Sequence, residues 1–222
     1  MSLLDRVLGE LSRRGLLLKQ DKRLPNVVGL VTGESLSTSW WGHPEGGRIF
    51  GVLEELDDHA DVVCTKLLSG KDTFVHRRLW PSLLAVAAAR EPWQQHGLTP
   101  GARRLLASVD AGSEPIRASG PAVRELERRL LVRAGQVHTE SGRHAVVLEP
   151  WTRWARRVRC SRARSVSPAR RDLEEAARDL GAAPSALPWP THGEDDGEER
   201  PRDIVSRRWA KATRRPRSPS KA

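Results

Sequence analysis

Cysteine is scarce in this chain of 222 residues, which contains only Cys64 and Cys160. The two lie in unlike contexts and make no disulfide framework, so free thiols in a reducing cytoplasm are the simplest interpretation. A run of eighteen apolar residues is also missing, which excludes a membrane-spanning helix. The first fifteen residues carry charges throughout and are therefore not a secretory signal peptide. We expect a cytoplasmic protein.

Catalytic and metal-binding motifs are missing as well. A zinc site needs four convergent ligands, and we find at most two in any one place. A tight two-residue turn places His138 and His144 on opposite faces of one hairpin. In the simplest register of the first hairpin, Cys64 and His76 also lie on opposite faces. The Gly-rich stretch 42–47 precedes a helix but lacks the Lys-Ser/Thr of a phosphate-binding P-loop, and no nucleophile elbow occurs. We predict no metal ion and no cofactor.

The net charge of +10 is unevenly placed along the chain. Residues 1–150 have 20 basic and 18 acidic side chains, whereas residues 151–222 have 18 basic and 10 acidic ones. Two basic stretches, 153–164 and 202–221, have tryptophans interleaved. Such stretches bind DNA, RNA and other polyanions without sequence specificity and with a steep salt dependence. A solubilising tail is the alternative, since the segregated charge after Thr191 favours disorder.

A helix that runs into a β-hairpin is the most informative pattern, and it occurs twice. Residues 48–56 lead into a hairpin at 62–81, and residues 123–131 lead into a hairpin at 134–151. Both hairpins turn at Ser-Gly followed by a basic residue, and both end at a Trp. The helical spacing of Val123, Leu126 and Leu130 defines a core face in the second helix.

Short extended segments at 34–39 and 114–119 precede the two helices. Strand, helix and two-stranded wing in that order are typical of a winged helix. We therefore predict an α+β fold with tandem winged-helix-like units and a basic, partly disordered C-terminal region. The predicted parts are residues 1–92 (first unit), 93–160 (second unit), 161–190 (C-terminal helix and Pro-Trp anchor) and 191–222 (disordered charged tail).

Further local signals complete this outline. Leu16–Lys19 is a possible short strand, and the apolar run Val27–Val31 fits either a strand or a helix. Three helices have their expected N-terminal caps at Thr99, at Ser119 and at Ser167-Pro168. The neighbouring residues Trp40 and Trp41 are suited to stacking on a base. In an extended segment they point to opposite sides, so at least one of them is expected in the core.

The two repeated helices differ in charge. The first helix has four acidic residues at its end and directly after it, between positions 54 and 58. A phosphate backbone repels them, so the first unit is expected to be a scaffold. The second helix is marginally basic and is followed by the Arg-rich segment. A plain packing role of that helix is the alternative. The residues from which we expect nucleic-acid contacts are Lys71, Arg124, Arg128, Arg129, Arg143, His144, Arg153, Arg156 and Arg157.

The motifs SGKDTFVHRRLWP and VHTESGRHAVVLEPW resemble those of uncharacterised bacterial winged-helix proteins. More remotely, residues 20–155 resemble the AlkZ/YcaQ-like DNA glycosylases, which are built of tandem winged helices. That family uses a Gln-x-Gln motif, whereas Gln94 and Gln95 are adjacent here, and the chain is far shorter. The resemblance implies the fold and a DNA-directed role, and does not extend to the activity.

A DNA-binding or DNA-associated protein, with a role such as DNA repair, is the function that we predict. Its expected partner is double-stranded DNA, with other polyanions bound through the tail, and no membrane is expected to take part. One alternative is a divergent glycosylase that acts on a flipped base. Another is an adaptor whose winged units bind a second protein.

Overall fold

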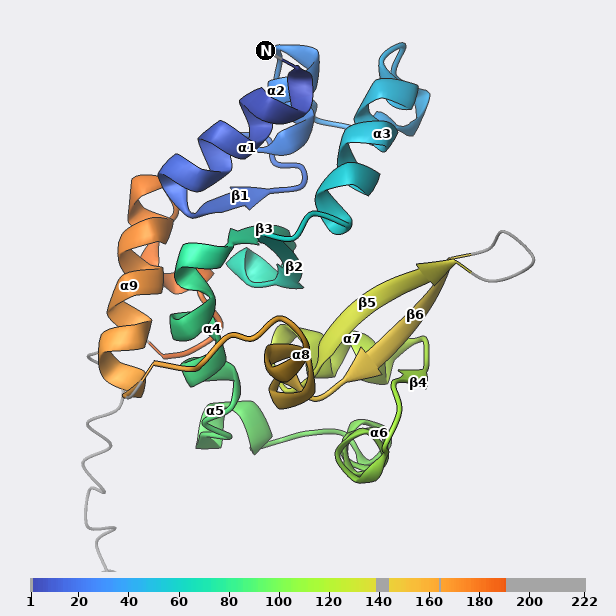
Figure 1. Cartoon of the computed structure of the whole chain (residues 1–222), viewed down its shortest axis with the longest axis vertical. Coiled ribbons are helices and arrows are strands. Elements are labelled where there is room, and N and C mark those ends of the chain that lie inside the picture. The colour runs from blue at the N-terminus through green and yellow to red at the C-terminus, as the bar shows by residue number, and fades with distance from the viewer. Residues whose placement is uncertain (1, 139–143, 164, 191–222) are drawn as a thin grey trace, which may run out of the picture. The chain divides into compact units, whose positions relative to one another are not determined.

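Helices and two small antiparallel sheets make up the computed structural model, which describes residues 2–138, 144–163 and 165–190 (Figure 1). The predicted α+β class is confirmed. The predicted tail at 191–222 and the turn at Ser141-Gly142 lie outside the described residues. The first unit contains α1 (Leu3–Arg14), β1 (Leu16–Leu18), α2 (Val27–Thr32), α3 (Gly46–Asp57), β2 (Val62–Lys66), β3 (Asp72–His76) and α4 (Trp80–Ala87). After it come α5 (Pro92–Gln95), α6 (Pro100–Ala111), β4 (Ile116–Arg117), α7 (Pro121–Arg128), β5 (Arg133–His138), β6 (His144–Glu149), α8 (Trp151–Arg157) and α9 (Val166–Asp179).

Both sheets have the same strand order. The first is β1-β3-β2 and the second is β4-β6-β5, so each hairpin pairs through its second strand with a short strand that precedes the helix. The helix before each hairpin is α3 in the first unit and α7 in the second. The repeated helix-into-hairpin pattern is therefore confirmed.

The first sheet is buried on both faces because its side chains alternate between two hydrophobic clusters. Leu17 and Phe74 face the cluster that includes residues of α1, α2 and α3. Leu16 and Val75 face the cluster that includes residues of α4, α8 and α9. Val7 and Leu11 of α1 are fully buried in the first of these clusters, as the apolar spacing of that helix predicts.

The second sheet has one apolar face. Leu148 is fully buried against α6 and α7, together with the predicted core residues Val123 and Leu126. On its other face, Gly135 and Val147 are only partly buried.

The segment after the second unit folds back onto the first unit. In Figure 1, α9 lies beside α4, and Ala169 and Leu173 join the cluster of α4. Leu187 and Trp189 are buried there too, so the predicted anchor packs on the body. None of the helices within the described ranges is long and apolar enough to cross a membrane.

One predicted extended segment is wrong, and one open alternative is decided by the structure. No strand forms at 34–39. The strand that pairs with the first hairpin is β1, because three leucines fill both faces of the sheet and the polar 34–39 segment does not. The run Val27–Val31 is helical, since the Asn26 side chain accepts a hydrogen bond from Gly29 N at 2.8 Å and caps it.

Two predicted caps are also wrong, and one is confirmed. Thr99 caps α6 as expected, through a hydrogen bond from Ala102 N at 3.2 Å. Ser119 does not cap α7; Gly120, with a φ of +97°, precedes Pro121 there. The helix α9 begins at Val166 rather than at Ala169, because Pro168 falls within its first turn, where proline is tolerated.

The predicted hairpin registers are wrong by one residue. Val62 pairs with His76 in the first hairpin, and His138 pairs with His144 in the second. In the first hairpin five residues, 67–71, join the strands in place of a tight two-residue turn. One step of register moves side chains to the opposite face. Cys64 therefore shares a face with His76. Even so, no group of three His, Cys, Asp or Glu residues suited to a metal ion occurs in the part of the chain that the structure describes.

Candidate nucleic-acid interface

The helix α7 presents two of the predicted arginines to solvent. Arg124 and Arg128 lie four residues apart and are exposed, while Val123 and Leu126 face the core. Neither arginine makes an ion pair within residues 2–138, 144–163 and 165–190. The stem of Arg128 lies against the turn of the first hairpin, where a Cβ on Gly70 would be 3.1 Å from Nε. Both guanidinium groups are placed to meet an anion.

Arg129, the third arginine of this segment, has a structural task. Its Nη1 donates hydrogen bonds to the carbonyl oxygens of Trp93 (3.0 Å) and His96 (2.6 Å) at the end of α5. In return, Gln94 Nε2 donates to Arg129 O at 3.1 Å. These bonds fasten α7 to α5 and use donors that a phosphate would need.

Gln94 itself is fully buried. Its Nε2 also donates to Ala87 O at 3.2 Å, and its Oε1 accepts from Glu91 N at 2.8 Å. The amide is thus occupied by backbone groups of α4 and α5. A glutamine in this position supports the fold and does not face a ligand.

Lys71, at the tip of the first hairpin, is paired. Its Nζ lies 2.6 Å from Asp21 Oδ2. Burial alone raises the pKa of Asp21, but the hydrogen bonds from Lys71 and from two backbone N–H groups lower this pKa to about 2. The ion pair is therefore present at neutral pH, and it competes with any phosphate for the lysine.

The Arg-rich segment likewise contains both arginines that have partners and an arginine that has none in the part of the chain that the structure describes. Arg156 is exposed without an ion pair among the described residues, whereas Arg153 donates a hydrogen bond to Gly112 O. Arg157 binds Glu149, with Nη1–Oε2 at 2.8 Å and Nη2–Oε1 at 2.6 Å. Arg133 Nη1 donates to the same carboxylate at 3.0 Å. Two arginines thus neutralise one buried glutamate.

Tryptophans in this segment serve the core rather than a nucleic acid. Trp151 and Trp154 are both 3% exposed, and their rings pack edge to face with centroids 5.6 Å apart. Trp80 of α4 meets Trp154 at 4.8 Å. These two tryptophans of the Arg-rich segment are therefore part of the hydrophobic cluster.

The two predicted contact residues near the tip of the second wing have no described side chains. Arg143 lies outside the described residues, and His144 is placed in β6 without a described side chain. Their predicted contacts stay predictions.

Three exposed arginines of the second unit were missed by sequence reasoning. Arg103 and Arg104 lie on α6, and Arg117 lies on β4. None of them has an acidic partner within the described ranges. The helical spacing of Ala102, Leu106 and Val109 was the available signal, since it predicts a buried side of α6 and directs Arg103 and Arg104 outward.

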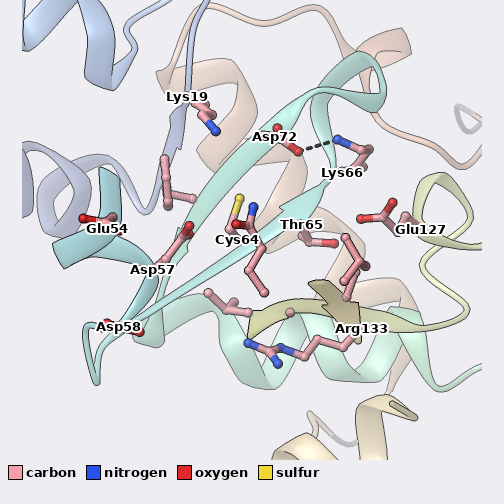
Figure 2. A pocket seen from close by; sticks show the side chains of 16 residues that line it. Lys19, Glu54, Asp57, Asp58, Cys64, Thr65, Lys66, Asp72, Glu127 and Arg133 are labelled. Atoms are coloured by element: carbon pink, nitrogen blue, oxygen red, sulfur yellow. Dashed lines mark hydrogen bonds and ion pairs between the residues drawn. The ribbon is translucent and has the colours of Figure 1, made fainter. Parts of the chain in front are cut away.

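A polar cleft of about 340 Å³ lies between the two hairpins and was not predicted (Figure 2). Its walls come from α3, β2, β3, α7, β5 and β6. In Figure 2, Asp57 and Glu127 lie on different sides of the cleft, and Cys64 and Thr65 lie between them. Sequence reasoning missed the cleft because its residues are far apart along the chain. The ionisable residues that line it are Lys19, Glu54, Asp57, Asp58, Cys64, Lys66, Asp72, Glu127 and Arg133.

Desolvation in the cleft shifts several of these groups. It raises the pKa of Asp57 and of Glu127, although Lys19 and Lys66 respectively oppose the change. It also raises the pKa of the Cys64 thiol well above its usual range, so the thiolate is suppressed and the sulfur is a poor nucleophile. Lys66 is held by Asp72 in an ion pair.

No protein-family model, no curated protein and no solved structure matches this chain. A proposal for its function therefore rests on its own residues and geometry.

Proposed function

We propose that this protein binds DNA through two winged-helix-like units, with the second unit and its Arg-rich segment contacting phosphates. Each unit has a strand, a helix and a hairpin in that order, with the strand orders β1-β3-β2 and β4-β6-β5. In this arrangement α7 takes the place of the helix that enters the DNA groove. The hairpin β5–β6 takes the place of the wing.

The observation that carries the proposal is the set of unpaired arginines in the second unit. Residues 93–160 have 12 basic and 6 acidic side chains, whereas residues 1–92 have 12 of each. Arg124 and Arg128 on α7 are exposed and have no acidic partner in the described residues. Such guanidinium groups release counterions when they meet phosphates, which favours binding at low salt.

Electrophoretic mobility shift with a blunt duplex over a salt series tests the proposal. We expect binding that weakens steeply with salt. The double variant Arg124→Ala/Arg128→Ala should bind about tenfold more weakly or worse, with a salt slope shallower by about 2, one for each phosphate contact.

Arg23→Ala is a matched control, because Arg23 is an exposed arginine of the first unit. It should bind as the unsubstituted protein does. A chain that ends at Pro190 measures how much of the DNA affinity comes from the tail. Absence of any shift at low salt would rule out DNA binding, and a shift lost only on removing the tail would exclude the second unit.

The cleft favours one second candidate, a divergent DNA glycosylase. Pockets with carboxylates of raised pKa are where general acids and bases are found, and Asp57 and Glu127 fit that description. Release of a base from alkylated duplex DNA, abolished by Asp57→Asn or Glu127→Gln, would support this activity. No release by the unsubstituted protein would exclude it for that substrate.

A further inference from the structure

Trp41 is an exposed aromatic side chain of the first unit. It is 70% exposed and is the one large hydrophobic residue that stands out among the described parts of the chain. An exposed indole of this kind leaves a large apolar ring in water, and covering it is favourable.

The ring is held in place from one side. Trp40 and Trp41 lie in the 3-10 turn η1 (Trp40–Gly42), and their rings stack with centroids 4.2 Å apart and planes inclined by 22°. Trp40 is 5% exposed and belongs to the core, so the prediction that one of the two is buried is confirmed. The prediction that they point to opposite sides is wrong, because the turn is not extended. Phe50 of α3 supports Trp41 at 6.2 Å.

The stacked pair adjoins the beginning of α3. A Cβ on Gly46 would lie 3.6 Å from Trp41 O, and no atom comes within 4 Å of a Cβ on Gly47. Of the neighbouring carboxylates, Glu45 is paired with a cation, since its Oε2 is 2.5 Å from Arg48 Nη1. Glu34 Oε1 is 3.4 Å from His43 Nε2, a contact that is an ion pair only when the histidine is protonated.

This surface is too small for a protein partner. A stable protein interface buries about 800 Å² on each side around an apolar core, whereas Trp41 has no exposed large hydrophobic neighbour among the described residues. One rigid ring face is sufficient for one base, because stacking of a nucleobase on an aromatic side chain needs no further apolar surface.

We propose that Trp41 stacks on an unpaired nucleobase, so that the chain prefers duplex DNA with a single-stranded extension. The preference for a junction rests on the proposed function. This stacking platform lies near the beginning of α3. An extension of ten nucleotides, at about 3.4 Å each, spans about 34 Å and offers several unpaired bases to the ring.

Binding of three probes tests the proposal: a blunt duplex, the same duplex with a ten-nucleotide extension, and a duplex whose extension consists of abasic nucleotides. The full chain should bind the normal extension roughly tenfold more tightly than the blunt duplex, which is within the range for stacking of one base. The abasic extension should bind like the blunt duplex. Trp41→Ala should lose the preference and keep its affinity for the blunt duplex, whereas Trp41→Phe should retain part of the preference.

Arg124→Ala/Arg128→Ala is the matched control, because it should weaken all three probes by the same factor. Circular dichroism shows whether each variant folds. If Trp41→Ala does not fold, Trp41→Phe still tests the proposal. Equal binding of all probes by the unsubstituted protein, or an undiminished preference in Trp41→Ala, overturns the proposal. Single-stranded DNA should quench the fluorescence of the unsubstituted protein more than that of Trp41→Phe. If single-stranded DNA quenches the fluorescence but the blunt duplex does not bind, base stacking on Trp41 stands and duplex binding by the second unit is rejected.

Discussion

The two units have the same strand order but bury their sheets differently. The first sheet is covered on both faces, by the clusters of Leu17 and of Leu16. The second is covered on one face, and Val147 on the other is only partly buried. Their charge differs as well, because residues 1–92 are neutral and residues 93–160 have a net charge of +6. The first unit is therefore the more deeply buried and the neutral one, whereas the second has the surplus of positive charge that an anion requires.

The largest expected effect concerns the enclosed sheet. Phe74→Ala should lower the free energy of unfolding by about 3–5 kcal/mol, because it leaves a cavity in a fully buried site. Val147→Ala in the open sheet should cost about 1 kcal/mol. Chemical denaturation of both variants measures the contrast. Equal losses would mean that the two sheets are enclosed to the same degree.

Glu149 gives the next largest effect, because the second unit buries this carboxylate between Arg133 and Arg157. Glu149→Gln should cost about 3 kcal/mol at pH 7, since two guanidinium groups lose their counter-charge. Burial alone raises the pKa of Glu149, but the hydrogen bond from Arg157 and the charge of Arg133 lower it overall. Its stabilisation is therefore full above the ordinary pKa of 4.5 and is lost as the pH falls through the lowered value. The stability of Glu149→Gln should vary less with pH below pH 4.5, which a pH series of thermal unfolding would measure.

Substitutions of Lys71 and Arg128 contrast a cation that has an acidic partner with one that has none among the described residues. Lys71→Ala should remove about 1 kcal/mol or less of stability, as expected for an ion pair at the surface. Because the pKa of Asp21 is lowered to about 2, that contribution is present above pH 3.8 and disappears as the pH falls toward 2. DNA binding should respond to Arg128→Ala and hardly to Lys71→Ala. If a mobility-shift titration shows a larger loss of DNA affinity for Lys71→Ala than for Arg128→Ala, the first unit is not merely a scaffold.

The smallest effect is expected in the cleft. Desolvation raises the pKa of Asp57, so ionisation at neutral pH disfavours the folded state. Asp57→Asn should therefore increase the free energy of unfolding slightly, by no more than about 0.5 kcal/mol, as for other surface substitutions. The gain should vanish below pH 3.8, where the carboxyl is protonated in both states. A loss of stability at pH 7 would show that the charge is compensated.

Helices and hairpins were predictable where the local pattern is strong. The apolar spacing of α1, the Thr99 cap and the two helix-into-hairpin segments all agree with the structure. Hairpin register was not predictable, because one added residue in the connection moves every side chain to the other face. The short strand at Leu16–Lys19 was predicted and is β1, but its pairing with the first hairpin was not, since a run of three leucines has no alternating pattern that would identify a partner.

The site was less predictable than the fold. Sequence reasoning identified Arg124, Arg128 and Arg156 as exposed cations, but nothing local distinguishes them from Arg129 or Arg157. Those two differ only in their long-range partners, His96 O and the Glu149 carboxylate. The cleft combines residues from six elements and has no local signature.

The sequence by itself determined the helices, the hairpins, their repetition and the uneven charge of this protein, because these depend on neighbours within a few residues. Tertiary structure alone decided which arginines are occupied, which face of each sheet is enclosed and why Trp41 is exposed while Trp40 is buried. The physical reason is that burial and pairing depend on groups far apart in the chain, and a one-residue shift in a turn is enough to exchange them.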